Sequence, residues 1–228
     1  MSEIKFATIG TSKITKTFLS AASNVPGFEL EATYSRNIKN AIEFGTPYNV
    51  TKFYDSLKAL AEDRTIDAVY IASPNAFHCS QAIQMMKAGK HVLCEKSLAS
   101  NKKEAEEMFR TAAENNVILL EAMRPVFDPG MDAVKASLNK LGVIRRATLN
   151  YCQYSSRYDS FLQGHEHNIF SKECSAGALM DIGTYCVHSL LCLFGKPQKV
   201  MGFSDMIRGD IDGAGTILAK YPNMIAEV

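Results

Sequence analysis

Apolar and polar positions alternate along the first half of the chain in a pattern typical of strands separated by amphipathic helices. Short apolar runs predict strands, and apolar residues repeated every three or four positions predict helices. The predicted strands are Ile4–Ile9, Phe28–Tyr34, Lys52–Tyr54, Asp67–Ala72, His91–Cys94 and Val117–Glu121, and the predicted helices are Ile14–Ser23, Ile38–Phe44, Ser56–Glu62, Ala76–Ala88 and Lys102–Glu114. Strands that alternate with crossover helices imply a doubly wound α/β fold, in which a parallel sheet has helices on both faces.

The pattern changes after about residue 122, so we predict two domains, 1–122 and 123–228. The second half has fewer helices and more strands, which is typical of an α+β domain with a mostly antiparallel sheet. Its predicted elements are a helix over about Met131–Lys140, a long strand Ile144–Tyr154, an irregular segment Ser155–Ser175, a helix over about Ala178–Phe194, and strands near Lys199–Phe203 and Thr216–Tyr221. Residues 223–228 resemble the start of another strand, so we expect this sheet to be incomplete, to be covered by a partner strand, or to belong to a longer protein.

Composition and charge favour a globular protein without a polyanionic partner. Apolar residues make up 46% and charged residues 21% of the chain, and 25 basic and 24 acidic residues give a formal charge of +1. This balance gives no reason to expect nucleic acid or a membrane as partner. No apolar run approaches the roughly 20 residues that span a bilayer, and no signal peptide is recognised. The six cysteines form no C-x-x-C pair, so we expect a cytoplasmic protein with reduced thiols.

A candidate phosphate-binding turn follows the first predicted strand. The segment Gly10-Thr11-Ser12-Lys13-Ile14-Thr15 lies where Rossmann domains carry G-x-G-x-x-G/A, between a strand and the helix that it opens. Such a turn aims backbone amides at the negative charge of a pyrophosphate. Only Gly10 matches the pattern, while Ser12 and Thr15 replace the other glycines with small hydroxyl side chains. A plain strand-to-helix turn without a ligand stays open as the alternative.

The end of the second predicted strand indicates which dinucleotide would bind. An acidic residue there would bind the ribose 2′-hydroxyl of NAD, whereas an arginine suits the 2′-phosphate of NADP. This chain has Tyr34-Ser35-Arg36-Asn37 at the position, and Glu31 falls in the middle of the strand. Ser35 and Arg36 therefore favour NADP, with NAD possible. The alternative for Arg36 is a solvated arginine at a helix start.

Two further segments carry polar side chains beyond predicted strands. Ser73-Pro74-Asn75, followed by His78, comes after one buried strand, and Glu95-Lys96 comes directly after the next. Ligands of doubly wound sheets bind outside the carboxyl ends of the strands. We therefore expect Glu95 and Lys96 to face the cofactor, the alternative being a surface ion pair.

These segments resemble the Gfo/Idh/MocA family of oxidoreductases. The family patterns are A-G-K-H-V-x-x-E-K-P and T-P-N-x-x-H; this chain matches both except that Ser73 replaces the threonine and Ser97 replaces the proline. Because proline would restrain the backbone beyond Lys96, its loss bears on how the lysine is presented. The resemblance implies hydride transfer between a nicotinamide cofactor and a secondary alcohol of a sugar, cyclitol or diol. It also implies the cofactor-binding residues Gly10, Thr11, Ser12, Lys13, Ile14, Ser35, Arg36, Ser73, Pro74, Asn75, His78, Glu95 and Lys96.

The resemblance further implies a catalytic pair on the second domain, in the tyrosine version typical of the dimeric dihydrodiol dehydrogenase and glucose–fructose oxidoreductase branches. The segment Gly177–Tyr185 places Asp181 and Tyr185 four residues apart, so both would lie on one face of a helix. Tyr185 would exchange the hydroxyl proton, Lys96 would favour its phenolate, and Asp181 would hold a substrate hydroxyl or the lysine. The alternative for Tyr185 is a core tyrosine, and His188 is interpreted as a packing residue.

The remaining candidates are weaker. His165-Glu166-His167 lies in an irregular loop and is interpreted as a substrate-side segment, because neighbouring residues rarely share one metal ion. Arg124 follows the last strand of the first domain and is a candidate to line a cleft. The sequence thus predicts a dinucleotide-binding domain over 1–122 and a substrate and oligomerisation domain over 123–228, the protein forming a homo-oligomer through the second sheet. A cofactor-binding sensor without turnover is the alternative function.

Overall fold

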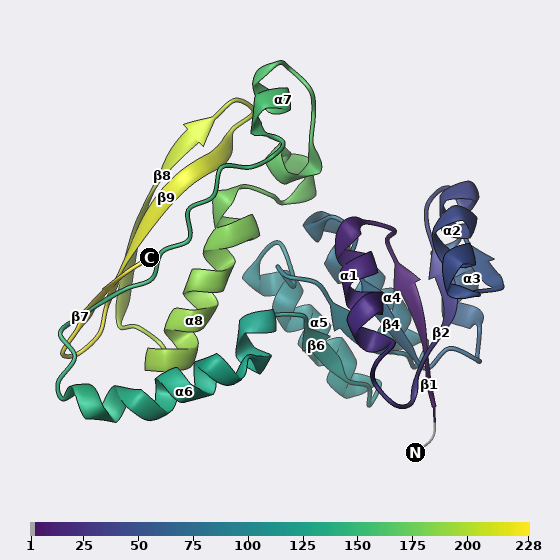
Figure 1. Cartoon of the computed structure of the whole chain (residues 1–228), viewed down its shortest axis with the longest axis horizontal. Coiled ribbons are helices and arrows are strands. Elements are labelled where there is room, and N and C mark those ends of the chain that lie inside the picture. The colour runs from purple at the N-terminus through teal and green to yellow at the C-terminus, as the bar shows by residue number, and fades with distance from the viewer. Residues whose placement is uncertain (1–2) are drawn as a thin grey trace. The chain divides into compact units, whose positions relative to one another are not determined.

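The computed structural model describes residues 3–228, which form two compact units, one up to Ala122 and the other from Met123 to Val228 (Figure 1). The first is a doubly wound parallel sheet, as predicted, with its strands in the order β3-β2-β1-β4-β5-β6. Its strands are β1 Ile4–Ile9, β2 Phe28–Tyr34, β3 Lys52–Tyr54, β4 Ala68–Ile71, β5 His91–Cys94 and β6 Leu119–Glu121. Its helices are α1 Lys13–Ala22, α2 Ile38–Gly45, α3 Leu57–Glu62, α4 His78–Lys87 and α5 Lys102–Glu114, with short 3₁₀ turns η1 Thr46–Tyr48 and η2 Asn75–Phe77.

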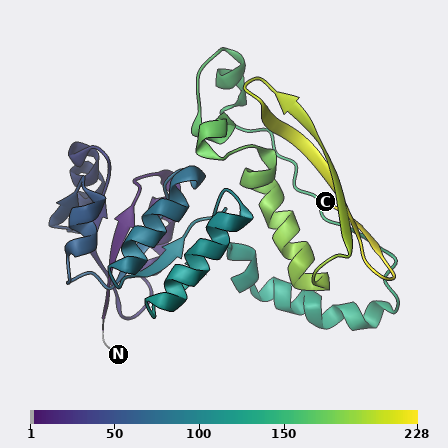
Figure 2. The same ribbon diagram turned by 180° about the vertical axis from the view of Figure 1, so that it is seen from behind.

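Helices cover both faces of this sheet, because its strands point apolar side chains to each face. Figures 1 and 2 show α1 on one face and α4 and α5 on the other. On the α1 face, Phe18 stacks on Tyr70 of β4 with 3.9 Å between ring centroids. On the other face, side chains of the strands pack against the methionines of α4 and α5; this core includes Ala7, Ile9, Val69, Ile71, Val92, Cys94, Met85, Met86 and Met108. Burial on both faces explains why the central strands lack a polar side.

The second unit contains a mixed four-stranded sheet in the order β7-β10-β9-β8. Its strands are β7 Arg146–Thr148, β8 Lys199–Ile207, β9 Ile211–Lys220 and β10 Ile225–Glu227. Its helices are η3 Arg124–Phe127, α6 Pro129–Leu138, η4 Asn139–Leu141, α7 Tyr158–Leu162, η5 Asn168–Phe170, η6 Lys172–Cys174, η7 Leu179–Gly183 and α8 Thr184–Phe194. The predicted long strand Ile144–Tyr154 is wrong, because β7 pairs only with the three residues of β10.

Helix α8 packs against the second sheet through its apolar side. Leu190 and Phe194 join a cluster with Ala219, Tyr221 and Met224. The whole helical stretch Lys172–Phe194, 23 residues, is long and apolar enough by length and composition to cross a membrane, which the sequence pattern did not lead us to expect. Within this stretch Leu190 and Phe194 contact the sheet, while most of the other side chains are partly exposed.

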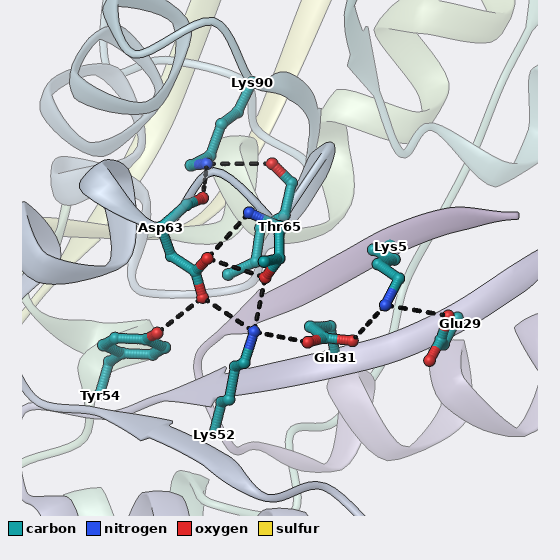
Figure 3. Close-up of polar contacts among 9 residues, drawn as sticks. Lys5, Glu29, Glu31, Lys52, Tyr54, Asp63, Thr65 and Lys90 are labelled. Carbon is teal, nitrogen blue, oxygen red and sulfur yellow. Dashed lines mark hydrogen bonds and ion pairs between the residues drawn. The ribbon is translucent and has the colours of Figure 1, made fainter.

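A network of charged groups lies on the first sheet at β1, β2 and β3 (Figure 3). Lys52 Nζ lies 2.6 Å from Glu31 Oε1 and 3.3 Å from Asp63 Oδ2, and Lys5 Nζ lies 3.1 Å from Glu31 Oε2. Asp63 also accepts hydrogen bonds from Thr65 N and Oγ1 and from Tyr54 OH, each 2.8 Å long. The network ties the loop between α3 and β4 to the first strands.

Lys90, directly before β5, also holds the loop between α3 and β4. Its side chain is buried, and Nζ donates to Asp63 O at 2.6 Å and to Ile66 O at 3.0 Å (Figure 3). Burial lowers the pKa of this ammonium group, although the negative charges of Asp63 and Asp67 act to raise it. The lysine of the Gly89-Lys90-His91 segment therefore has a structural role in the fold.

The carboxylate of Asp63 gives the fold a testable dependence on pH. Burial acts to raise its pKa, but the hydrogen bonds from Thr65, Tyr54 and Lys52 outweigh burial and hold the pKa well below its ordinary value. The unfolded chain therefore binds this proton more readily, so the stabilisation is complete above the ordinary pKa of about 3.9 and is lost as the pH falls from there through the folded-state pKa.

We predict that Asp63→Asn lowers the free energy of unfolding by about 1–3 kcal/mol at pH 7, because Lys52 and Thr65 lose a charged acceptor. The difference from wild type should shrink as the pH falls below about 4. Urea unfolding at a series of pH values measures it, with the exposed neighbour Glu62→Gln as control. A difference that stays constant down to acid pH would contradict the assignment.

Candidate functional site

The candidate residues of the first unit gather at the edge where its parallel strands end. Gly10 follows β1 and donates its N–H to Tyr34 O at the end of β2, at 3.3 Å. Ala72 follows β4 and donates to Ile9 O, and Glu95 follows β5 and donates to Ile71 O, both at 2.8 Å. The four predicted segments thus leave neighbouring strands at one edge of the sheet.

The turn after β1 has the geometry that a phosphate-binding turn needs. Gly10 has φ +113°, and a Cβ at this position would lie 2.6 Å from Ala72 O, so only glycine fits. Ser12 is the N-terminal cap residue of α1, and its side chain makes no capping hydrogen bond. Lys13 and Ile14 are exposed in the first turn, and the buried Thr15 hydroxyl has no hydrogen-bond partner among residues 3–228. Ser12 Oγ and the first amides of α1 therefore fit an anionic group.

The segment after β2 presents an arginine beside an aromatic ring. Arg36 is exposed, and its Cζ lies 5.8 Å from the centroid of the Phe77 ring, while Ser35 N donates to Tyr54 O at 3.1 Å. Phe77, in η2 after β4, was not singled out by the sequence. Glu31 is engaged in mid-strand, where hydrogen bonds from Lys52 and then Lys5 hold the pKa of its carboxyl below the usual range. Because Glu31 lies in the middle of β2, Arg36 is the charged residue directly beyond the end of that strand.

His78 joins the loops after β4 and β5. Its ring is fully buried; Nε2 lies 2.8 Å from Ser73 O, and Nδ1 lies 2.8 Å from Ser97 O. Burial lowers the pKa of the ring, while the two carbonyl groups and the charges of Glu95 and Glu121 act to raise it. The structure thus places His78 beneath the loop, while Pro74 and Asn75, which precede it, are partly exposed.

Glu95 and Lys96 leave β5 in a turn that is held by several groups. Tyr70 OH donates to Glu95 Oε1 at 2.6 Å, and Lys96 N donates to Glu95 Oε2 at 3.2 Å. Leu98 N donates to Glu121 Oε1 at 2.9 Å. Glu121 was not predicted from the sequence, although an acidic residue at the end of a strand next to β5 is a recognisable signal. Glu95 is thus a structural acceptor as well as a candidate cofactor contact.

In the second unit, Asp181 lies in the π-helical turn η7, and Tyr185 lies in the first turn of α8. Leu179 N, at the start of η7, donates to Asp212 Oδ2 at 2.6 Å. The predicted helix is therefore correct in extent, but its first turn is π rather than α, a feature frequent at functional sites. The Tyr185 ring lies 5.9 Å from that of Tyr151, and both Asp181 and Tyr185 are partly exposed. Asp212 and Tyr151 were not predicted.

The weaker candidates have local partners. His165 Nδ1 lies 3.1 Å from Ser160 O, and His167 Nε2 lies 3.1 Å from Ser160 Oγ. Both histidines thus tie their loop to α7, and within residues 3–228 no three potential metal ligands come together. Arg124 opens η3, and His188 is partly buried in α8. The loop position predicted for His165-Glu166-His167 is confirmed, while a substrate contact stays a prediction.

The chain has relatives of known activity along almost its whole length. It is 47% identical over 218 residues to scyllo-inositol 2-dehydrogenase (NADP(+)) of Bacillus subtilis, a match that covers 96% of this chain and 66% of that protein. It is 28% identical over 223 residues to trans-1,2-dihydrobenzene-1,2-diol dehydrogenase of Mus musculus, which covers 96% of this chain and 65% of the mouse protein. The chain thus spans about two thirds of the length of these relatives.

Solved structures and family comparisons agree with the fold. The KijD10 3-ketoreductase of Actinomadura kijaniata, solved with NADP, matches with a TM-score of 0.86 at 25% identity, covering 99% of this chain and 69% of the other. Residues 4–123 match the oxidoreductase family with an NAD-binding Rossmann fold, and residues 135–228 match the GFO/IDH/MocA C-terminal domain. The chain therefore belongs to the GFO/IDH/MocA family of oxidoreductases.

Proposed function

We propose that this chain carries the activity of an NADP-dependent dehydrogenase that transfers a hydride between the nicotinamide and a secondary alcohol of a polyol. The relative at 47% identity is named as an NADP(+)-dependent scyllo-inositol dehydrogenase, and more distant relatives are named as diol dehydrogenases. An inositol is therefore the first substrate to test, and a diol the second. In this proposal the first unit binds the dinucleotide, and the second carries substrate-contacting and self-association surfaces.

The cofactor is assigned to the carboxyl edge of the first sheet. Backbone amides after Gly10 and the hydroxyl of Ser12 would hold the pyrophosphate, and Arg36 with Ser35 would hold the 2′-phosphate. Ser73, Pro74 and Asn75 would contact the dinucleotide beyond β4. The set proposed from the sequence is completed by Thr11, Lys13, Ile14, His78, Glu95 and Lys96, with His78 acting from beneath the loop rather than by direct contact.

The reaction needs a hydride acceptor and a group that moves the hydroxyl proton. When bound, the nicotinamide supplies the acceptor carbon. We assign proton exchange to the phenol of Tyr185, orientation of a substrate hydroxyl to Asp181, and orientation of the substrate oxygen and ribose to Lys96. The observation that carries the proposal is the position of Lys96, which leaves β5 in a turn fastened to Glu95, His78 and Glu121.

The second sheet has apolar side chains on its surface that support self-association. On β8, Val200, Met201, Phe203 and Met206 are more than half exposed. Large apolar groups gathered on one sheet are typical of surfaces that another polypeptide covers. A homo-oligomer formed through this sheet is therefore part of the proposal.

Arg36 should decide between the two dinucleotides. Arg36→Ala removes the guanidinium that would pair with the 2′-phosphate, so we predict that the dissociation constant of NADP rises about tenfold or more while that of NAD changes little. Calorimetric titration with each cofactor measures both. The control is Arg64→Ala, an exposed arginine in the loop before β4, at the opposite edge of the sheet. Equal weakening of NADP and NAD by Arg36→Ala would contradict the assignment.

Lys96 should matter for turnover more than for cofactor binding. We predict that Lys96→Met lowers the rate of NADP reduction with scyllo-inositol by about 100-fold or more, because the substrate oxygen loses its orienting cation. The dissociation constant of NADP should change only a few-fold. Lys102→Met, at an exposed ion pair with Glu106, is the matched control. Turnover equal to wild type would refute the role of Lys96, and NADP binding without turnover by wild type would favour a sensor.

A further inference from the structure

The turn that presents Lys96 lacks the proline of the family pattern, so other groups must restrain it. Proline restricts its own φ and the conformation of the residue before it, whereas Ser97 restricts neither. Ser97 is nevertheless buried, and its neighbours Lys96 and Leu98 both donate backbone hydrogen bonds to carboxylates. Side chains from other elements therefore provide the restraint.

Glu121 is the anchor that comes from a different strand. It ends β6 and pairs in register with Cys94, the last residue of β5. Ala122 N, directly after it, donates to Cys94 O at 2.7 Å, which fastens the two strand ends together. Glu121 Oε1 then accepts the Leu98 N–H at 2.9 Å. A hydrogen bond from a backbone amide to a carboxylate is stronger than one between neutral groups.

His78 is a second anchor of the same turn. Its ring nitrogens face two carbonyl oxygens, Ser97 O and Ser73 O, each at 2.8 Å. His78 therefore holds the carbonyl group of Ser97, and Glu121 holds the amide of Leu98.

We propose that Glu121 is a positioning residue for Lys96, acting through its hydrogen bond to Leu98 N in place of the restraint that proline would provide. The inference rests on the proposed function only for the role of Lys96 in the reaction. It identifies a residue that does not touch the substrate but sets the geometry of one that does.

The test uses the full chain and three variants. Glu121→Met keeps the size of the side chain but removes the acceptor, Glu121→Gln keeps an oxygen that accepts from Leu98 N, and Glu114→Met changes an exposed carboxylate at the end of α5. Amide hydrogen exchange at Leu98, measured by NMR, reports the bond itself. The rate at which acetic anhydride acetylates Lys96, measured by mass spectrometry, reports the position of the amine without any cofactor.

We expect Glu121→Met to speed exchange at Leu98 about tenfold or more and to change the acetylation rate of Lys96 several-fold. It should lower kcat about tenfold while the KM for NADP stays within about twofold, since the phosphate turn is untouched. Glu121→Gln, whose neutral amide accepts a weaker hydrogen bond, should lie between wild type and Glu121→Met, and Glu114→Met should behave as wild type. If Glu121→Met does not fold, Glu121→Asp, which shortens the side chain by one methylene, takes its place with the same expected signs.

The proposal would be overturned if Glu121→Met left the exchange at Leu98 unchanged. It would also be overturned if exchange became faster while the acetylation rate of Lys96 and kcat both stayed as in wild type. A loss of kcat as large in Glu121→Gln as in Glu121→Met would also overturn it, because the amide keeps a hydrogen bond to Leu98 N. If wild type reduces no NADP, the proposed function fails, and the exchange and acetylation rates still decide whether Glu121 positions Lys96.

Discussion

The parallel direction of the six strands in the first sheet is the constraint on which the candidate site depends. Strands that run the same way end at one edge, so the turns after β1, β2, β4 and β5 leave side by side. Hydrogen bonds continue across the strand ends, from Gly10 to Tyr34 and from Glu95 to Ile71. Residues far apart in the sequence are thereby brought to the same edge of the sheet. The apolar burial of both faces leaves this edge as the place for polar chemistry.

The charged residues of the first unit have different roles according to where they lie along the strands. Lys5, Glu31, Lys52 and Asp63 neutralise one another on the sheet, and Lys90 binds two carbonyl groups beneath the loop after α3. Arg36 lies beyond a strand end and is exposed. Charge that is already paired stabilises the fold, whereas the exposed Arg36 is the charge that we propose for the cofactor.

Much of the first unit could be predicted from the sequence, because its strands and helices carry strong periodic patterns and its turns carry Gly10, Pro74 and the Glu95-Lys96 pair. The second unit was harder. The segment Ile144–Tyr154, in which apolar and polar residues alternate, has the pattern of a strand, but β10 supplies a partner for only three residues. No local pattern distinguishes the π turn η7 from an α turn, since its widening accompanies a hydrogen bond from Leu179 N to Asp212, 33 residues away.

In the candidate site, too, some residues were predicted from local motifs, whereas others depend on neighbours that are distant in the sequence. Residues that act through their own loop, such as Gly10 and Lys96, were visible in motifs. Glu121 and Phe77 were missed because their roles arise from neighbours in space: Glu121 lies on the strand beside β5, and Phe77 lies beside Arg36. The serine at position 97 was recognised as a departure from the family pattern, but the hydrogen bond from Leu98 N to Glu121 beside it became visible only in the fold.

The most direct test of the central account is to follow a labelled hydride. The chain would be incubated with NADP and a cyclitol deuterated at its ring carbons, and the nicotinamide analysed by mass spectrometry. If the chain transfers a hydride, the reduced cofactor will carry one deuterium from the carbinol carbon. Tight binding of NADP with no deuterium in the nicotinamide, from the cyclitol or from a deuterated diol, would contradict it.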